Sequence, residues 1–228
     1  MPHDPTIDRL RALDICDLSD ALDSLGLAPA VTGLVATSGG RAIAGRAVTV
    51  ELAAGSPPPS AERRHLCTTA VEQAGPDDVI VVEQRSGIDA AGWGGILSRA
   101  ARRRGIAGTI VDGPVRDVEE AMRLDYPVFA RSTTARTARG RIHEVAAQVP
   151  IRLGDTTVSP GDYIAADRSG CVAVPAARIA DVLARAEAIF AKSEEMAAAV
   201  ERDVPVSKVM GGEYESMLEN GNDKRRRG

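Results

Sequence analysis

Two short apolar runs separated by a helical segment constrain the fold of this chain most strongly. The runs Val79–Val82 and Gly108–Val111 have the length and the β-branched content of buried strands. Between them, Ile96–Arg104 has the residue spacing of a helix. Strands that alternate with helices are typical of parallel pairing, so the sequence predicts an α/β fold.

Similar elements extend this pattern in both directions. Helical spacing in the first 26 residues, ended by Gly26, predicts two short N-terminal helices. A strand is expected over Arg46–Leu52, before the proline-rich loop Gly55–Ser60. The remaining patterns predict helices over Ala61–Ala74 and Val118–Leu124 and a strand over Val128–Ala130.

The last third of the chain has a different pattern. Turn residues recur at short intervals through Ile142–Val174, which predicts antiparallel hairpins that form a second, all-strand layer. Pro175 then begins a long helix over Ala176 to about Glu201, because proline is tolerated in a first helical turn. We expect one domain over residues 1–204 and an extension over 205–228 whose polar end is frayed.

Composition argues against several classes of function. The chain has 228 residues, 28 of them basic and 32 acidic, a formal net charge of −4 and only 3% aromatic residues. It therefore lacks the basic field and the stacking side chains that nucleic-acid binding uses. The three lysines, Lys192, Lys208 and Lys224, all lie beyond the predicted α/β core, which argues against a Schiff-base mechanism.

Cysteine usage and hydropathy indicate a cytoplasmic protein without membrane partners. Cys16, Cys67 and Cys171 are far apart and form no CxxC pair, as expected of reduced thiols rather than of disulfides or a zinc cluster. The N-terminal segment lacks the apolar region that a secretory signal peptide has, and no stretch reaches the roughly 18 apolar residues that a membrane span needs.

The first segment with candidate chemistry is the glycine-rich stretch Ala91–Leu97, between a predicted strand and a predicted helix. Glycines at a helix N-terminus allow backbone amides to surround a carboxylate or phosphate. The alternative is that these glycines only allow the loop to turn. The stretch is no dinucleotide-binding motif, since a GxGxxG pattern from Gly92 would need glycine where Leu97 stands.

The second segment is VDGPVRD, Val111–Asp117, at the end of a predicted buried strand. Ligands commonly bind at such strand ends, and the guanidinium of Arg116 is suited to a carboxylate. The alternative is structural, because Asp117 stands three residues before Glu120 and the pair has the spacing of a capping box.

The two segments are predicted to share one cleft. Arg116 follows Leu97 by 19 residues, the length of one helix and one strand, so two adjacent strands would end side by side. An anion-binding loop, an arginine and an aspartate together suit a small keto acid chelated to Mg²⁺ or Mn²⁺.

These segments resemble the RraA-like family. The resemblance covers roughly Leu18 to Val200 and is most specific in Ala91–Arg131 and Val158–Pro175. The family includes class II 4-hydroxy-4-methyl-2-oxoglutarate aldolases, 4-carboxy-4-hydroxy-2-oxoadipate aldolases and the regulator of ribonuclease activity A. The resemblance implies a swivelling β/β/α domain with short N-terminal helices and a long C-terminal helix, assembled as a homotrimer or hexamer with active sites between subunits.

The resemblance also implies roles for individual residues. Arg116 matches the substrate-binding arginine and Asp117 the metal-binding aspartate, so both are candidate catalytic residues. Backbone amides of the matching loop would bind the keto-acid carboxylate; these are the amides of Gly94, Gly95, Ile96 and Leu97.

The resemblance to the family is less close in two places. Aldolases of the family commonly have an acidic residue where this chain has Gly95, and that residue supports the metal through water. Members also place a glutamate from the C-terminal helix of a neighbouring subunit near the site, and Glu194 and Glu195 are the candidates here.

The resulting hypothesis is a metal-dependent lyase that cleaves 4-hydroxy-2-oxo di- or tricarboxylic acids to pyruvate and decarboxylates oxaloacetate as a side reaction. The alternative is a non-catalytic regulator that binds protein. Asp117 favours the enzyme, because the well-known regulator has an uncharged residue there. A methyltransferase is a third alternative, but the chain lacks the acidic strand end and GxGxG motif that it would need.

For three further residues the sequence favours a structural role, and for a fourth two roles remain open. His143, beside Glu144 on a strand, is expected at the surface, and His65 is expected on the helix over Ala61–Ala74 with its ring in solvent. Cys171 is expected to be a small buried residue. For Trp93, covering a ligand and packing in the core remain alternatives.

Overall fold

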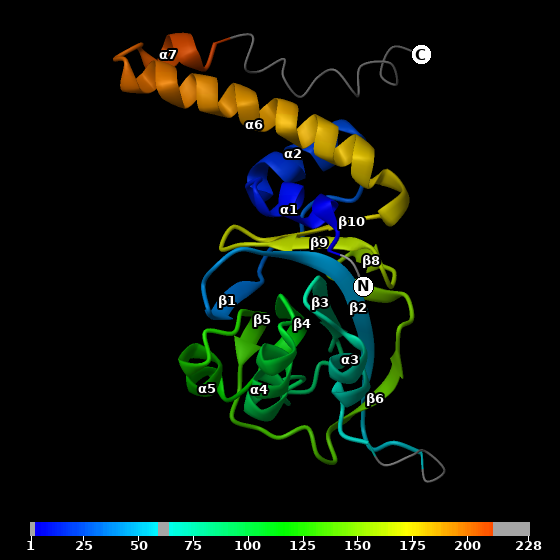
Figure 1. The fold of residues 1–228 in the computed structure, drawn as a ribbon. Coiled ribbons are helices and arrows are strands. Elements are labelled where there is room, and N and C mark those ends of the chain that lie inside the picture. The colour runs from blue at the N-terminus through cyan, green and yellow to red at the C-terminus, as the bar shows by residue number, and fades with distance from the viewer. Residues whose placement is uncertain (1–2, 59–63, 212–228) are drawn as a thin grey trace.

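The computed structural model describes residues 3–58 and 64–211. The polar end that was predicted to be frayed lies outside these residues. Within them the fold is mixed α/β, with one eight-stranded sheet in the order β1-β5-β4-β3-β2-β9-β10 and β6 paired with β2, and a separate hairpin of β7 and β8 (Figure 1). The strands are β1 (Val35–Ser38), β2 (Ile43–Ala54), β3 (Asp78–Glu83), β4 (Gly108–Val115), β5 (Val128–Thr133), β6 (Ile142–Ala147), β7 (Ile151–Leu153), β8 (Thr156–Val158), β9 (Tyr163–Ala166) and β10 (Cys171–Val174).

The predicted parallel core is confirmed. Strands β2, β3, β4 and β5 pair in parallel, and the crossovers between them contain α3 (Thr68–Gln73), α4 (Gly95–Arg104) and α5 (Val118–Arg123). The predicted antiparallel layer is confirmed too, because β9 pairs antiparallel with both β10 and the first part of β2.

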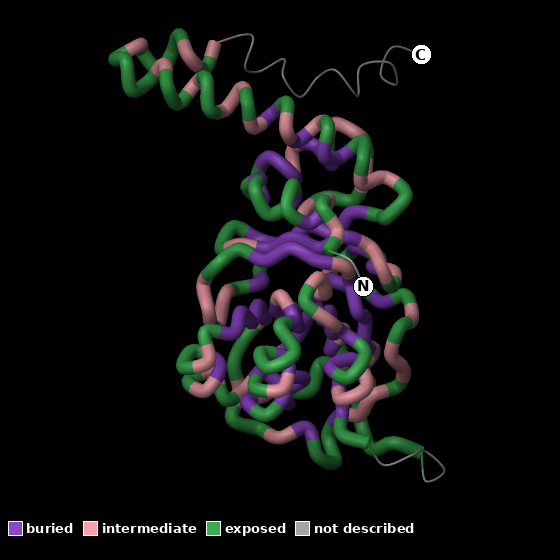
Figure 2. Tube along the Cα trace, viewed as in Figure 1, coloured by how far each residue is buried: buried purple, intermediate pink, exposed green. Residues whose placement is uncertain are grey.

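Alternating side chains join these strands into layers. On β3, Ile80 and Val82 pack in the cluster that includes α3, α4 and α5. Val79 and Val81 point the other way and share a second cluster with Ile164 of β9. The opposite faces of β9 and β10 pack against α1 (Pro5–Arg11), α2 (Ile15–Ser24) and α6 (Ile179–Glu201). The buried trace in Figure 2 follows these strand layers.

Both ends of the fold agree with the helices that the sequence predicts. The two short N-terminal helices are α1 and α2, and the long C-terminal helix begins as a 3-10 turn over Ala176–Arg178 and continues as α6. The short α7 (Val206–Val209) follows it. No helix within the described residues is long and apolar enough to cross a membrane.

The predicted helix over Ala61–Ala74 is wrong in its extent. Residues 64–67 are not helical, and α3 begins only at Thr68. Cys67 has a left-handed backbone with φ of 64°, which no α-helix can continue through. Its amide donates to the carboxylate of Glu144 at 2.5 Å, a contact between positions far apart in the sequence.

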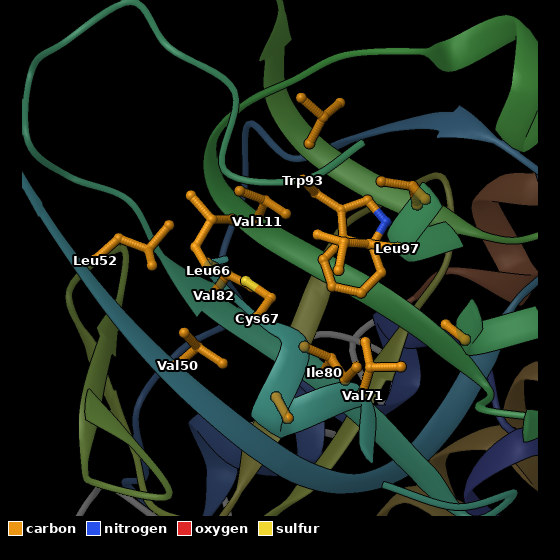
Figure 3. Packing of buried hydrophobic residues seen from close by; sticks show 14 of the residues in the cluster. Val50, Leu52, Leu66, Cys67, Val71, Ile80, Val82, Trp93, Leu97 and Val111 are labelled. Carbon is orange, nitrogen blue, oxygen red and sulfur yellow. The ribbon is translucent and has the colours of Figure 1, made fainter. Parts of the chain in front are cut away.

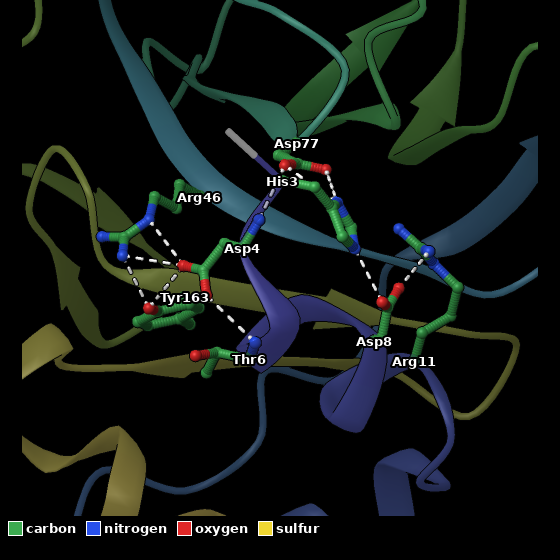
Figure 4. Close-up of polar contacts among 8 residues, drawn as sticks. All are labelled: His3, Asp4, Thr6, Asp8, Arg11, Arg46, Asp77 and Tyr163. Carbon is green, nitrogen blue, oxygen red and sulfur yellow. Dashed lines mark hydrogen bonds and ion pairs between the residues drawn. The ribbon is translucent and has the colours of Figure 1, made fainter. Parts of the chain in front are cut away.

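Polar contacts hold the N-terminus against the sheet (Figure 4). The carboxylate of Asp4 caps α1 at the amide of Thr6 and accepts hydrogen bonds from Arg46 at 2.8 Å and from the hydroxyl of Tyr163 at 2.8 Å. His3 contacts two further carboxylates, those of Asp8 at 2.6 Å and Asp77 at 3.1 Å. Hydrogen bonds to Asp8 and Asp77 raise the pKa of His3.

This raised pKa predicts a pH-dependent contribution of His3 to stability. The contribution is fully present below the unfolded-state pKa of about 6.5 and disappears as the pH rises through the higher folded-state pKa. We expect His3→Gln to lower the melting temperature at about pH 5.5 and to have a much smaller effect at about pH 9. Thermal unfolding followed by circular dichroism measures both, and an equal effect at the two pH values would contradict the prediction.

Candidate functional site

The glycine-rich loop and the Arg116 segment meet at one edge of the sheet. Strands β3 and β4 are parallel neighbours with Val82 opposite Val111, so their carboxyl ends lie together. The amide of Gly92 donates to the carbonyl of Pro114 at 2.9 Å, and the amide of Arg116 donates to the carbonyl of Trp93 at 3.1 Å. The structure therefore brings the two predicted segments into direct contact.

The side chain of Asp117 interacts with α4 rather than with the helix that it precedes. Its backbone is left-handed, with φ of 57°, and its side chain makes no capping hydrogen bond to α5. Instead, Oδ2 accepts the amide hydrogen of Gly95 at 3.0 Å and lies 3.4 Å from Nε of Arg116. The capping box with Glu120 is therefore not formed, and Asp117 links the two loops.

The amides at the start of α4 are the predicted carboxylate binders. The first hydrogen bond within this helix joins the Ser98 amide to the Gly94 carbonyl at 3.0 Å. The amides of Gly95, Ile96 and Leu97 come before it, so they have no partner within the helix. Asp117 already accepts from Gly95. Ile96 and Leu97 thus contribute the amides best placed for an external carboxylate. The side chain of Ile96 is 77% exposed, whereas that of Leu97 is buried.

The carboxylate of Glu120 closely approaches Gly95. A Cβ atom built on Gly95 would collide with Oε2 of Glu120 and lie 3.1 Å from Cβ of Asp117. Arg99 fixes the Glu120 carboxylate in this position, with Nη2 to Oε1 at 2.7 Å. Glu120 therefore brings an acidic group to the space where a side chain at position 95 would stand. Sequence reasoning missed this role, because the spacing of Asp117 and Glu120 had suggested a cap.

Trp93 packs in the core under the loop (Figure 3). It is 2% exposed, its ring stacks on Tyr126 with centroids 6.5 Å apart, and Nε1 donates to Oγ of Ser98 at 2.8 Å. The packing alternative is therefore the one that the structure supports. Cys171 is buried as expected, and burial raises its pKa to about 12.

His65 and His143 have different surroundings from one another. His143 lies on β6 and its Nδ1 is 3.2 Å from the carbonyl oxygen of Gly55, away from the glycine loop. His65 precedes α3 rather than lying on a helix, which corrects the expectation for this residue. Burial lowers the pKa of His65, and the positive charges of Arg139 and Arg116 lower it further.

Glu194 lies far from this site within one chain. It lines a cavity of about 370 Å³ together with Asp14, Asp17 and Asp167, between α2, α6 and the β9–β10 turn. Burial raises the pKa of Asp17, and the charges of Asp14, Asp20 and Glu194 raise it further. This acidic cavity repels an anionic keto acid. Because α6 lies on the other side of β9 and β10 from α4 and α5, Glu194 and Glu195 would reach a glycine loop only in another subunit (Figure 1).

The side chains beside α4 fit a hard divalent cation with few protein ligands. The Glu120 carboxylate approaches the Cβ position of Gly95, and the Asp117 carboxylate lies beside it at the Gly95 amide. Among residues 3–58 and 64–211, no three acidic, histidine or cysteine side chains converge as a metal site. Mg²⁺ is commonly bound by one or two carboxylates, with water and substrate oxygens as its other ligands, so this pair suits Mg²⁺ better than zinc.

Known proteins similar to this chain share its fold and sequence pattern. The RraA-like family, described as Aldolase/RraA, matches residues 15–173. A protein of Halalkalibacterium halodurans named "Putative 4-hydroxy-4-methyl-2-oxoglutarate aldolase" is 30% identical over 202 residues, which cover 87% of this chain and 90% of that protein. The crystal structure of an uncharacterized protein from Pseudomonas syringae superposes with a TM-score of 0.80 at 30% identity, covering 91% of this chain and 97% of the other.

Another relative is much longer than this chain. Protein DlpA of Legionella pneumophila is 30% identical over 184 residues, which cover 81% of this chain but only 30% of DlpA. The chain thus spans about a third of DlpA and nearly the full length of the Halalkalibacterium halodurans protein. The family match and the glycine loop joined to Arg116 and Asp117 lead to one conclusion: this chain belongs to the RraA-like (Aldolase/RraA) family.

Proposed function

We propose that this protein is a divalent-metal-dependent carbon–carbon lyase that cleaves 4-hydroxy-2-oxo di- or tricarboxylic acids and releases pyruvate. The observation that carries the proposal is the Asp117 carboxylate, which is fixed by the Gly95 amide at 3.0 Å beside Arg116 and the first amides of α4. The name of the Halalkalibacterium halodurans relative supports the same activity.

Asp117 and Glu120 are the residues that would hold Mg²⁺ or Mn²⁺, Asp117 directly and Glu120 from the space beside Gly95. When bound, such an ion acts as a Lewis acid toward the oxygens of a 2-oxo acid. The amides of Ile96 and Leu97 bind the carboxylate next to the keto group, and they orient the substrate at the positive end of α4.

Arg116 stabilises the charge that develops during cleavage. When the bond between C3 and C4 breaks, its electron pair moves toward the keto oxygen and gives pyruvate enolate, while the 4-hydroxyl gives its proton to solvent water and becomes a carbonyl. A proton from water at C3 then converts the enolate to pyruvate. A guanidinium next to the keto oxygen is a fixed electrostatic stabiliser of the enolate. Loss of carbon dioxide from oxaloacetate leaves the same enolate, so we expect that reaction as well.

No step of this scheme uses a lysine. The three lysines of the chain, Lys192, Lys208 and Lys224, lie on α6 or beyond it. We further propose a cytoplasmic homotrimer or hexamer in which Glu194 or Glu195 of one subunit approaches the site of the next. Asp117 favours this lyase over a purely protein-binding regulator, because a carboxylate held against α4 has no evident use in a protein-binding surface.

The first prediction concerns the class of mechanism. With a panel of 2-oxo acids, we expect pyruvate release to stop when EDTA removes the metal and to return when Mg²⁺ or Mn²⁺ is added. Borohydride in the presence of substrate should cause no inactivation, since no imine forms. Activity that resists EDTA but is destroyed by borohydride would overturn the proposal.

The second prediction separates the catalytic role of Asp117 from its role in folding. Asparagine tolerates a left-handed backbone as well as aspartate does, and its side-chain oxygen still accepts the Gly95 amide hydrogen. We expect Asp117→Asn to keep the melting temperature but to reduce pyruvate release at least about 100-fold, as loss of a charged ligand does. Activity within about twofold of the original protein would make Asp117 a structural residue only.

The third prediction tests the position of Glu120. We expect Glu120→Gln to raise the metal concentration needed for half-maximal activity about 10- to 100-fold. Arg99→Gln is the matched control, because it breaks the same ion pair and keeps the carboxylate. Equal effects of the two variants would show that the ion pair, rather than the Glu120 carboxylate, matters.

A further inference from the structure

A buried glutamine contacts both the glycine loop (Ala91–Leu97) and the segment that carries Arg116 (Val111–Asp117). Gln84 is the residue directly after β3, and it is only 3% exposed. Most buried polar side chains in folded proteins are hydrogen-bonded, so the partners of its carboxamide group indicate its role. The substrate-binding groups of the proposed lyase lie on these two segments, and Gln84 lies where the segments meet.

The carboxamide nitrogen of Gln84 holds the chain that leads into the glycine loop. Nε2 donates to the carbonyl of Ile88 at 3.1 Å and to the carbonyl of Ala90 at 3.0 Å. A carboxamide nitrogen carries two hydrogens, and these two carbonyls use both of them. The Ala90 amide also donates to the Ile88 carbonyl, at 2.9 Å. The Gln84 side chain thus fixes the turn directly before Ala91, and neither of its N–H groups is left for a substrate.

The rest of the Gln84 side chain packs against both segments. A Cβ atom on Gly92 would lie 3.3 Å from Cγ of Gln84. A Cβ atom on Gly113 would lie 2.9 Å from Cβ of Gln84 and would collide with its Oε1. Because no side chain stands at these two positions, Gln84 fits closely against the backbone of each segment.

The contact between the two segments runs from Gln84 to Asp117. Beside Gln84, the Gly92 amide donates to the carbonyl of Pro114 at 2.9 Å. At the other end, Oδ2 of Asp117 accepts the amide hydrogen of Gly95 at 3.0 Å. A side chain therefore joins the segments at each end of the contact, Gln84 at the buried end and Asp117 at the exposed end.

We propose that Gln84 is a positioning residue of the lyase site, which sets the distance between the substrate-binding amides of α4 and the Arg116 guanidinium. This inference rests on the proposed lyase function and adds a residue that touches neither substrate nor metal. A single small molecule must reach both groups at once, because its carboxylate binds the amides while its keto oxygen lies beside Arg116. A misplacement of about 1 Å between such groups costs roughly 100-fold in rate.

The polar end of Gln84 is necessary for this role. The carbonyl oxygens of Ile88 and Ala90 need a hydrogen-bond donor. An apolar side chain of the same length would fill the space beside Gly92 and Gly113, but it would remove the donor from both carbonyls. Since a buried carbonyl without a partner costs stability, the chain before the glycine loop would shift toward solvent and change the spacing of the two segments.

Gln84→Met tests the proposal, because methionine has nearly the same length and no donor. The assay is pyruvate release from 4-hydroxy-4-methyl-2-oxoglutarate with saturating Mg²⁺. We expect kcat to fall about 10- to 100-fold while KM changes less than about threefold, since either segment alone still binds the substrate but the transition state needs both. Circular dichroism gives the folded fraction at the assay temperature, so kcat is expressed per folded molecule. If this variant does not fold, Gln84→Asn replaces it; its shorter side chain cannot reach both carbonyls, and the same split with a smaller loss is expected.

Thr49→Val is the matched control. Thr49 is buried, and its hydroxyl donates to the carbonyl of Val149 at 2.6 Å. It stands opposite Val81, on the face of the sheet that packs against the antiparallel layer. This variant also leaves a carbonyl without its donor, so we expect a lower melting temperature and a kcat within about twofold of the original. A fall in kcat as large as that of Gln84→Met would overturn the positioning role.

Amide hydrogen exchange in the free protein separates this inference from the proposed function. The amides of Gly92 and Arg116 donate across the contact and exchange when the segments part. We expect Gln84→Met to speed exchange about tenfold in residues 91–97 and 113–117 together, and Thr49→Val to leave both unchanged. If the original protein releases no pyruvate but exchange changes in this way, the lyase fails and the role of Gln84 in holding the segments stands. If pyruvate is released while Gln84→Met changes neither kcat nor exchange by more than about twofold, the role of Gln84 is refuted and the lyase stands.

Discussion

The pairing of one long strand with two different layers is the constraint on which the structure depends. The first residues of β2 pair antiparallel with β9, its middle pairs parallel with β3, and its end pairs antiparallel with β6. Apolar side chains leave β2 in both directions, with Val48 and Val50 toward α3 to α5 and Ala47 toward the antiparallel layer. Strand β2 thus joins the layer that packs on α1, α2 and α6 to the parallel strands whose edge carries Arg116.

The candidate site follows from this arrangement, since parallel neighbours end at the same edge. At that edge, the backbones of β3 and β4 approach so closely that a Cβ atom on Gly113 would lie 2.6 Å from the carbonyl oxygen of Gln84. Close approach also explains Gly94, whose Cβ position is 2.9 Å from Oδ2 of Asp117. At Gly113 the lack of a side chain is therefore a packing requirement, and at Gly94 it leaves room for the Asp117 carboxylate.

Local sequence patterns predicted most helices and strands. The features that they could not predict, the start of α3 and the role of Glu120, depend on contacts between residues far apart in the sequence. Alternation and helical spacing indicated β2 to β5, the hairpins and α6, because each depends on neighbouring residues. The start of α3 depends instead on the hydrogen bond between Cys67 and Glu144, which are 77 positions apart. The role of Glu120 was equally hidden, since its spacing from Asp117 also fits a cap, and only the position of Arg99 distinguishes the two. His65 was misplaced for the same reason as α3.

Cys67 and Cys16 lie in chemically different environments. Cys67 lies under the glycine loop, where burial and the nearby Glu144 charge raise its pKa well above that of a free thiol. Cys16 is exposed on α2, on the side of β9 and β10 away from α4 (Figure 1). Since the thiolate is the reactive form, alkylating reagents modify Cys16 first. A spectroscopic label can therefore be attached to the folded protein at one point, distant from the loop, without any change to the sequence.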